Sequence, residues 1–135
     1  MVTGASSGIG RQTAIWLSKQ GAHLTLVARN VERLEQTMQQ LDGENHSCQP
    51  FDFLSGNDVG VWMKTLVKST GLPFDGLVHS AGVLMPKPIR LLGLEQWEQQ
   101  FATNVTSGFS LIKGFRQKGV YNKGASIVLI SSVMG

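Results

Sequence analysis

The chain has 135 residues, of which 41% are hydrophobic and 16% charged, so it suits one globular domain or part of one. The formal net charge is +3, and its twelve Lys and Arg are scattered, so we expect no nucleic-acid partner. No apolar run approaches the roughly 20 residues of a membrane span, and no signal-peptide pattern is evident, so we expect no membrane partner. Cys48 is the only cysteine, which excludes an internal disulfide and favours a reducing, cytoplasmic location.

The stretch Thr3–Gly10, which reads Thr-Gly-Ala-Ser-Ser-Gly-Ile-Gly, lies between a short β-branched run and a segment with helical spacing. A strand, a tight turn and a helix start in this order form a phosphate site, because the free N–H groups of the helix face the anion. Gly4 allows a turn with positive φ, Gly8 lets a diphosphate approach the backbone, and Gly10 lets the helix pack closely. Taken alone, the motif also fits an ordinary βα turn that needs glycine.

Hydrophobic spacing in the first half of the chain predicts alternating strands and helices. The predicted elements are a clipped strand at Met1–Thr3, a helix at Ser7–Gln20, a strand at His23–Ala28, a helix capped by Asn30, and a strand at His46–Phe51. Within the first helix, the residues expected near one face are Ile9, Thr13, Trp16 and Leu17.

The second half continues the same alternation. Its predicted elements are a helix at Ser55–Thr70, a strand at Asp75–His79, a loop at Val83–Gly93, a helix from Leu94 to about Gly119 with room for a break, and a strand at Ala125–Ser131. This order predicts the α/β class: a doubly wound, mostly parallel sheet of about five strands with helices on both faces. Ligands of such sheets bind outside the carboxyl ends of the strands.

Polar residues follow the second and third predicted strands, where that fold binds ligands. Arg29 comes nineteen positions after Gly10, where an acid would bind a ribose 2′-hydroxyl and an arginine accommodates a 2′-phosphate. A solvated arginine before a helix is the alternative. Asp52 is interpreted either as a partner of an adenine amino group or as a turn aspartate near a helix start.

Small and polar residues also follow the fourth and fifth predicted strands. His79–Gly82 (His-Ser-Ala-Gly) forms a turn where a ribose could lie close to the backbone, and His79 itself is interpreted as a core histidine bonded to backbone. Ser131 and Ser132 could bond a substrate oxygen, or they could simply end the strand.

Together these motifs resemble the N-terminal part of a short-chain dehydrogenase/reductase. The stretches that carry the resemblance are Thr3–Gly10, Asp52, Ser80-Ala81-Gly82, Phe101-Ala102-Thr103-Asn104-Val105 and Ile127-Val128-Leu129-Ile130-Ser131-Ser132. The resemblance implies a Rossmann-like fold and hydride transfer between a nicotinamide and a carbonyl or alcohol. It also implies a small-molecule substrate and, for the full-length protein, a homo-oligomer.

The resemblance also implies roles for individual residues. Ser132 matches the serine that orients the substrate oxygen, and Asn104 matches the helix asparagine that holds a water in the proton relay. A polar helix breaker facing a neighbouring strand is the alternative for Asn104. Arg29, with no acid beside it, resembles members that prefer NADP(H), with NAD(H) as the second cofactor; no metal is expected. The expected cofactor-binding residues are Gly4, Ser6, Ser7, Gly8, Ile9, Gly10, Arg29, Asp52, Phe53, Ser80, Ala81 and Gly82.

The chain departs from the family pattern in three respects, one of which is the clipped first strand. His79-Ser80 replace two asparagines, and whether His79 ties the central sheet together stays open. The family's Tyr-x-x-x-Lys motif does not occur, because Tyr121 is expected before the fifth strand and position 125 is alanine. We therefore expect residues 1–135 to be one NAD(P)-binding Rossmann-type domain, clipped in its first strand and truncated at its C-terminus.

The sequence thus predicts an NADP-preferring oxidoreductase of the short-chain dehydrogenase/reductase type, of which this chain alone is inactive. One alternative is a non-catalytic nucleotide-binding protein of the same fold. The other is an inactive truncated product with no stable fold.

Overall fold

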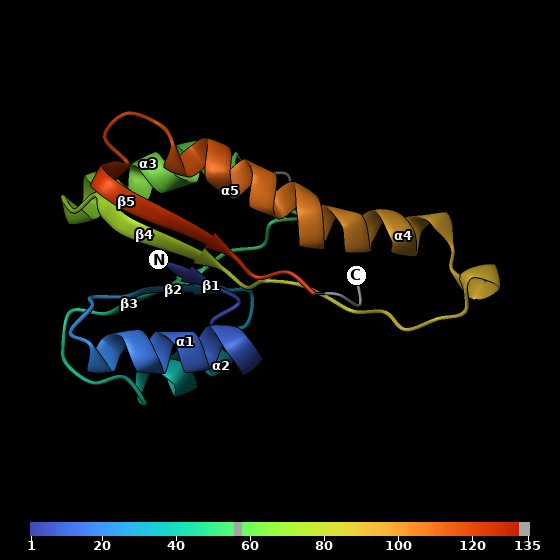
Figure 1. The fold of residues 1–135 in the computed structure, drawn as a ribbon, viewed down its shortest axis with the longest axis horizontal. Helices are drawn as coiled ribbons and strands as arrows, with labels where there is room; N and C mark the ends of the chain where they lie inside the picture. The colour runs from blue at the N-terminus through green and yellow to red at the C-terminus, as the bar shows by residue number, and fades with distance from the viewer. Residues whose placement is uncertain (56–57, 133–135) are drawn as a thin grey trace. The chain divides into compact units, whose positions relative to one another are not determined.

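The structure, a computed structural model, describes residues 1–55 and 58–132 of the chain. Strands and helices alternate along it (Figure 1), as the sequence predicts. The elements are β1 (Val2–Thr3), α1 (Gly8–Lys19), β2 (Thr25–Ala28), α2 (Val31–Met38), β3 (Ser47–Pro50), α3 (Val59–Thr70), β4 (Phe74–His79), η1 (Ile89–Leu91), α4 (Leu94–Phe101), η2 (Ala102–Thr106), α5 (Ser107–Phe115) and β5 (Tyr121–Leu129). They fall into two compact units: the first comprises Met1–Asp52, Phe74–Ala81 and the residues from Lys123 on, and the second comprises Phe53–Pro73 and Gly82–Asn122.

The first unit contains a five-stranded sheet in the order β3-β2-β1-β4-β5. The short strand β1 pairs in parallel with β2 on one side and β4 on the other, and β3 pairs in parallel with β2. The backbone N–H of Ile130, just after β5, donates to the carbonyl of His79 at 2.9 Å. The predicted α/β class, the mostly parallel sheet and the count of about five strands are confirmed.

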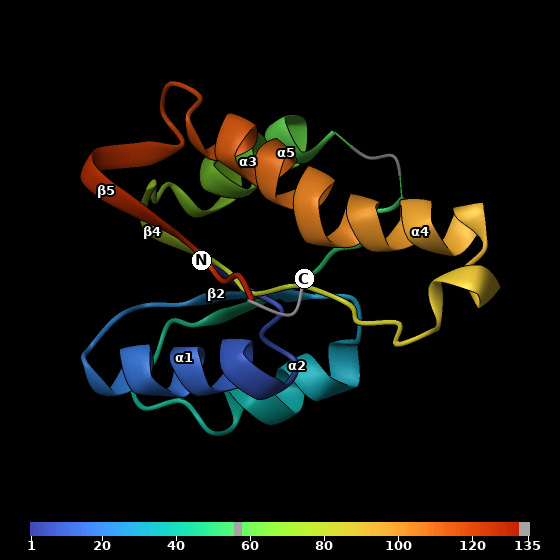
Figure 2. The same ribbon diagram turned by 45° about the vertical axis from the view of Figure 1, so that its right-hand side comes forward.

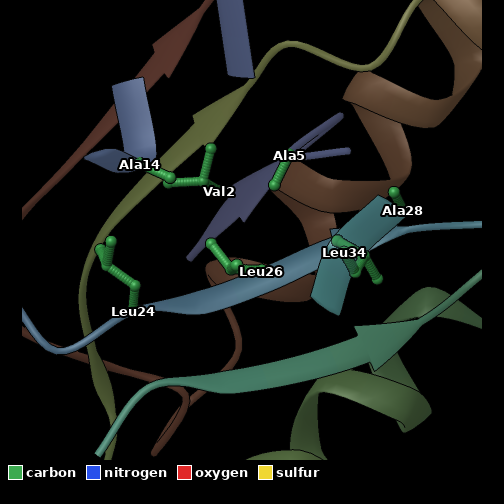
Figure 3. Packing of buried hydrophobic residues seen from close by; sticks show 7 residues of the cluster. All are labelled: Val2, Ala5, Ala14, Leu24, Leu26, Ala28 and Leu34. Carbon is green, nitrogen blue, oxygen red and sulfur yellow. The ribbon is translucent and has the colours of Figure 1, made fainter. Parts of the chain in front are cut away.

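Helices α1 and α2 lie side by side against β1 and β2, and Figures 1 and 2 show this arrangement from two directions. Their buried contacts with the sheet form one apolar cluster, shown in Figure 3. The cluster contains Val2, Ala5, Ala14, Leu24, Leu26, Ala28 and Leu34. Because Ala5 of the cluster belongs to the loop between β1 and α1, this packing holds that loop against the sheet.

The face of α1 that packs inward differs from the face that hydrophobicity indicates. Its buried residues are Gly10, Ala14 and Ser18, at intervals of four, whereas Ile9 is 60% exposed and Trp16 is 61% exposed. Small side chains let the helix axis come close to the sheet, so Ile9 and Trp16 point away from it, while Leu17 packs against the apolar cluster.

In the second unit, α3 packs against α5. The buried residues of α3 are Val59, Met63 and Leu66, which recur at the spacing of one helix face. The helix ends at Gly71, whose φ of 70° is a left-handed C-cap. It begins later than predicted, because the Asp58 carboxylate caps it by accepting the N–H groups of Gly60 and Val61 at 2.7 and 3.0 Å. The prediction from Ser55 includes residues 56 and 57, which lie outside the described part.

The long helix predicted from Leu94 is three consecutive segments. The break is the π-helical segment η2, between α4 and α5. The last segment ends at Phe115 rather than near Gly119, whose φ is 84°. The predicted loop at residues 83–93 contains the single 3₁₀ turn η1.

The strand β5 begins at Tyr121, four residues before the predicted start. The expectation that Tyr121 precedes this strand was therefore wrong. Its ring stacks on Phe115 with centroids 5.8 Å apart, and the Arg116 guanidinium lies 4.8 Å from the ring centre. These contacts hold an aromatic residue, a good strand former, in extended backbone. Over residues 1–55 and 58–132, the structure contains no helix that is both long and apolar enough to span a membrane.

Candidate functional site

The strand register brings the predicted cofactor residues of the first unit to one edge of the sheet. Thr3 is aligned with Val27 of β2 and with His79 of β4, so the three strands end together. The residues that follow these ends are Gly4, Arg29 and Ser80. On the side of β2 away from β1, Ala28 is aligned with Pro50 of β3, and Asp52 comes two residues after Pro50. The parallel sheet therefore gathers four segments that are remote in sequence.

The loop from Gly4 to Gly10 has the backbone that the glycine spacing predicts. Gly4 has a φ of 67°, and a methyl group built there would meet the Ala81 nitrogen at 2.7 Å. A methyl group on Gly10 would overlap the Gly4 carbonyl, so both glycines are needed for close packing. Gly8 also has a positive φ, 52°, but a methyl group built there would meet no atom within 4 Å beyond the adjoining backbone. The start of α1 at Gly8 therefore leaves room for a ligand.

Two side chains that the sequence reasoning did not single out bind the carbonyls of this loop. The Thr37 hydroxyl of α2 lies 2.9 Å from the Ala5 carbonyl and 3.0 Å from the Arg33 carbonyl of its own helix. Arg11 donates from Nη2 to the Ser6 carbonyl at 2.6 Å and from Nε to the Thr37 hydroxyl at 2.9 Å. Sequence offers only a weak signal for this cluster, since Thr37 and Arg11 are 26 positions apart.

The hydroxyl of Thr3 connects β1 to β4. It accepts the Ala81 N–H at 3.4 Å and lies 2.7 Å from Nδ1 of His79. His79 is 4% exposed, and its burial lowers its pKa from the ordinary value of 6.5. The prediction that His79 is a buried core histidine is confirmed, and its ring contacts the Thr3 side chain. His79 does tie two central strands together.

The other predicted cofactor residues differ in their surroundings. Arg29 is exposed beside Asn30, whose side chain caps α2 by accepting the Arg33 N–H at 2.8 Å. Asp52 is half-buried, and Phe53, also half-buried, belongs to the second unit. In the loop itself, Ser6 is half-buried, whereas Ser7 and Ile9 are exposed.

The two residues predicted to be catalytic belong to different units. Ser131 and Ser132 follow β5 and are exposed in the first unit. Asn104 lies in the π-helical segment η2 of the second unit. Its Oδ1 accepts the Val83 N–H at 2.7 Å and its Nδ2 donates to the Val83 carbonyl at 2.8 Å. Both polar atoms of the Asn104 side chain therefore fix the segment that follows Gly82.

A hollow of about 240 Å³ lies at the opposite edge of the first unit, near Gly21 and Asp42. None of the predicted site residues lines it. The candidate cofactor site is therefore formed by the strand ends and the open space at Gly8, and this hollow has no part in it.

Comparison with known proteins agrees with this geometry. The family model described as short chain dehydrogenase matches residues 1–135. The 2,3-dihydro-2,3-dihydroxybenzoate dehydrogenase of Bacillus subtilis (strain 168) is 33% identical over 133 residues, which are 97% of this chain and 51% of that protein. The chain thus spans about half the length of the curated relatives it matches.

Solved structures show the same fold. A citronellol catabolism dehydrogenase of Pseudomonas aeruginosa PAO1 matches with a TM-score of 0.86 and 32% identity over 98% of this chain and 55% of that one. A variant of actinorhodin polyketide ketoreductase with NADPH matches with a TM-score of 0.78 and 32% identity, covering 87% of this chain and 46% of that one. The Rossmann-like fold class is confirmed by these likenesses.

Proposed function

The chain belongs to the short-chain dehydrogenase family, and we propose that its protein is an NADP-preferring oxidoreductase that transfers hydride between nicotinamide and a carbonyl or alcohol. The observation that carries this proposal is the loop at Gly8, open to free space at a helix start, with Arg29 at the same edge of the sheet. The relatives support the chemistry, since one is named a dehydrogenase and another a ketoreductase with NADPH.

The residues at the strand ends fit a dinucleotide. The backbone N–H groups at the start of α1 suit a diphosphate, and the absence of a Cβ at Gly8 leaves room for it. Arg29 would hold the 2′-phosphate, since a guanidinium offers several donors to phosphate oxygens. Asp52 would accept from the adenine amino group, and the turn Ser80–Gly82 would lie against the ribose.

The cofactor, when bound, supplies the hydride, and the protein supplies position and proton transfer. Ser132 would donate a hydrogen bond to the substrate oxygen and so orient the carbonyl. Both polar atoms of the Asn104 side chain bond Val83. A water of the proton relay would therefore be held by the backbone of η2 and not by the Asn104 side chain. The proton donor would be a tyrosine of a Tyr-x-x-x-Lys motif, which these 135 residues do not contain.

Several broader features of the protein belong to the same proposal. The substrate would be a small carbonyl or alcohol compound, and the full-length protein would be a cytoplasmic homo-oligomer. A chain of these 135 residues alone would form a single NAD(P)-binding domain without turnover, because it lacks the acid that protonates the carbonyl.

The test uses the full-length protein, NADPH deuterated at the nicotinamide C4, and a panel of ketones and aldehydes. We expect deuterium on the carbinol carbon of the product, and Ser132→Ala should lower kcat by orders of magnitude with little change in cofactor affinity. Ser131→Ala is the matched control. Turnover that survives in Ser132→Ala but disappears in Ser131→Ala would show that Ser131, and not Ser132, orients the substrate oxygen. A folded protein that binds NADPH and reduces no member of the panel would contradict the oxidoreductase proposal.

A further inference from the structure

The cluster formed by Arg11 and Thr37 has no part in the proposed chemistry, yet it holds the loop where the diphosphate would bind. Thr37 is fully buried in α2, and Arg11 is half-buried in the first turn of α1. Their side chains reach the carbonyls of two successive loop residues, Ala5 and Ser6. A third carbonyl, that of Ser7, accepts the backbone N–H of Arg11 at 3.2 Å.

These bonds determine the direction of the loop's N–H groups. In a trans peptide the C=O and the following N–H point in opposite directions. When the Ala5 carbonyl faces Thr37, the N–H of Ser6 must point away from α2. When the Ser6 carbonyl faces Arg11, the N–H of Ser7 must likewise point away from Arg11. The side-chain contacts therefore turn two amide hydrogens toward the outer side of the loop.

We propose that Arg11 and Thr37 are positioning residues, which orient the N–H groups of Ser6 and Ser7 for the diphosphate of the cofactor. This inference rests on the proposed function, since it assigns the loop a dinucleotide ligand. The Thr37 hydroxyl is central, because it accepts from Arg11 Nε and can donate its own hydrogen to the Ala5 carbonyl, with the Arg33 carbonyl of α2 as a second acceptor. A serine could make the same bonds, whereas a valine of the same shape could make none.

The same cluster ties the loop to α2, the helix that follows Arg29. Thr37 lies near the C-terminal end of α2, and Asn30 caps its other end. A single helix thus extends from the loop contact to the segment proposed for the 2′-phosphate. Because Asn30, and not Thr37, holds the end of α2 next to Arg29, we expect the cluster to affect ligands that contain a diphosphate and not a ligand that carries only the 2′-phosphate.

The test compares two probes, NADPH and 2′-AMP, on the full-length protein by fluorescence titration and calorimetry. Thr37→Val and Arg11→Met should weaken NADPH binding about tenfold or more, the usual effect of orphaning one or two buried partners. Binding of 2′-AMP, which has no diphosphate, should not change. Thr37→Ser keeps the hydroxyl, so its NADPH affinity should stay near the wild-type value.

Two matched variants control for the substitutions themselves. Thr65→Val removes a hydroxyl that bonds only within its own helix α3, and Gln12→Met replaces the exposed neighbour of Arg11. Both should bind the two probes like wild type. Equal loss of both probes in Thr37→Val, or unchanged NADPH affinity, would overturn the positioning role. If wild-type protein binds 2′-AMP but not NADPH, the proposed function itself fails.

Discussion

Arg29 is the residue on which the cofactor preference depends. It is exposed at the end of β2, and a charge-assisted hydrogen bond to a phosphate contributes about 1.5–3 kcal/mol. This free energy corresponds to roughly 10- to 150-fold in affinity. We expect Arg29→Asp in the full-length protein to weaken NADPH by that factor and to affect NADH far less, measured by titration of nicotinamide fluorescence.

Arg33 provides the control for this substitution. It lies four positions further, in the first turn of α2, and its backbone N–H, rather than its side chain, makes the cap contact with Asn30. Arg33→Asp introduces the same change of charge nearby, so it separates a direct phosphate contact from a general field effect. An equal loss of both cofactors in Arg29→Asp would contradict the 2′-phosphate assignment.

The buried pair His79 and Thr3 predicts how stability depends on pH. Burial lowers the His79 pKa below its ordinary 6.5, so the unfolded chain takes up a proton at a higher pH than the folded chain does. The contribution to stability is therefore complete above pH 6.5 and decreases as the pH falls below that value. We expect the free energy of unfolding to fall between pH 7.5 and pH 5.5, measured by denaturant titration of the full-length protein.

His79→Asn isolates this effect from the other two histidines of the chain. An asparagine can accept a hydrogen bond from the Thr3 hydroxyl but does not titrate in this range. The pH dependence of the variant should be flatter than that of wild type, and the difference between the two curves belongs to His79. Parallel curves would show that the pair does not control stability in this range.

At the scale of elements, the packing of α3 on α5 depends on Gly114. A methyl group on Gly114 would lie 2.9 Å from the Met63 sulfur and 3.3 Å from the Cα of Gly60. A larger side chain cannot fit without moving the helices apart, and such overpacking costs about 1–3 kcal/mol. We expect Gly114→Leu to lower the free energy of unfolding by that amount. Lys113→Leu adds the same side chain at the exposed neighbouring position, and an equal effect there would contradict the packing argument.

The elements themselves follow from the sequence where local chemistry decides them. The cap of α2 at Asn30 and the left-handed end of α3 at Gly71 are visible in the residues because both depend on neighbours along the chain. The buried face of α1 is not visible, because Gly10, Ala14 and Ser18 are buried for their small size rather than their hydrophobicity. Periodicity in apolar residues cannot reveal a face whose packing depends on close approach.

The start of β5 also could not be predicted from the residues around it. Tyr121 stands two positions after Gly119 and directly before Asn122 and Lys123, a setting that indicates a turn. In the structure it stacks on Phe115, a residue buried in the α5 helix. Such a tertiary contact overrides local preference and extends the strand. The same holds for the Arg11–Thr37 contact, which no spacing rule indicates.

For the whole molecule, the strand-end residues of the candidate site were predictable because a parallel sheet collects them by topology. Gly4, Arg29 and Ser80 each follow a strand, and the register places these strand ends together. What topology cannot supply is the orientation of individual peptides and side chains. The reciprocal bonds of Asn104 with Val83 are of this kind, since they join positions 21 residues apart.

The most direct test of the central claim is the affinity of NADPH for the full-length protein with and without a side chain at position 8. A methyl group built at Gly8 meets no atom within 4 Å beyond the adjoining backbone, although the φ of 52° strains any side chain there. We expect the wild-type protein to bind NADPH more tightly than NADH. Gly8→Val should abolish binding of both while the far-UV circular dichroism stays near that of wild type. A folded Gly8→Val variant that binds NADPH as well as wild type would show that this loop is not the cofactor site.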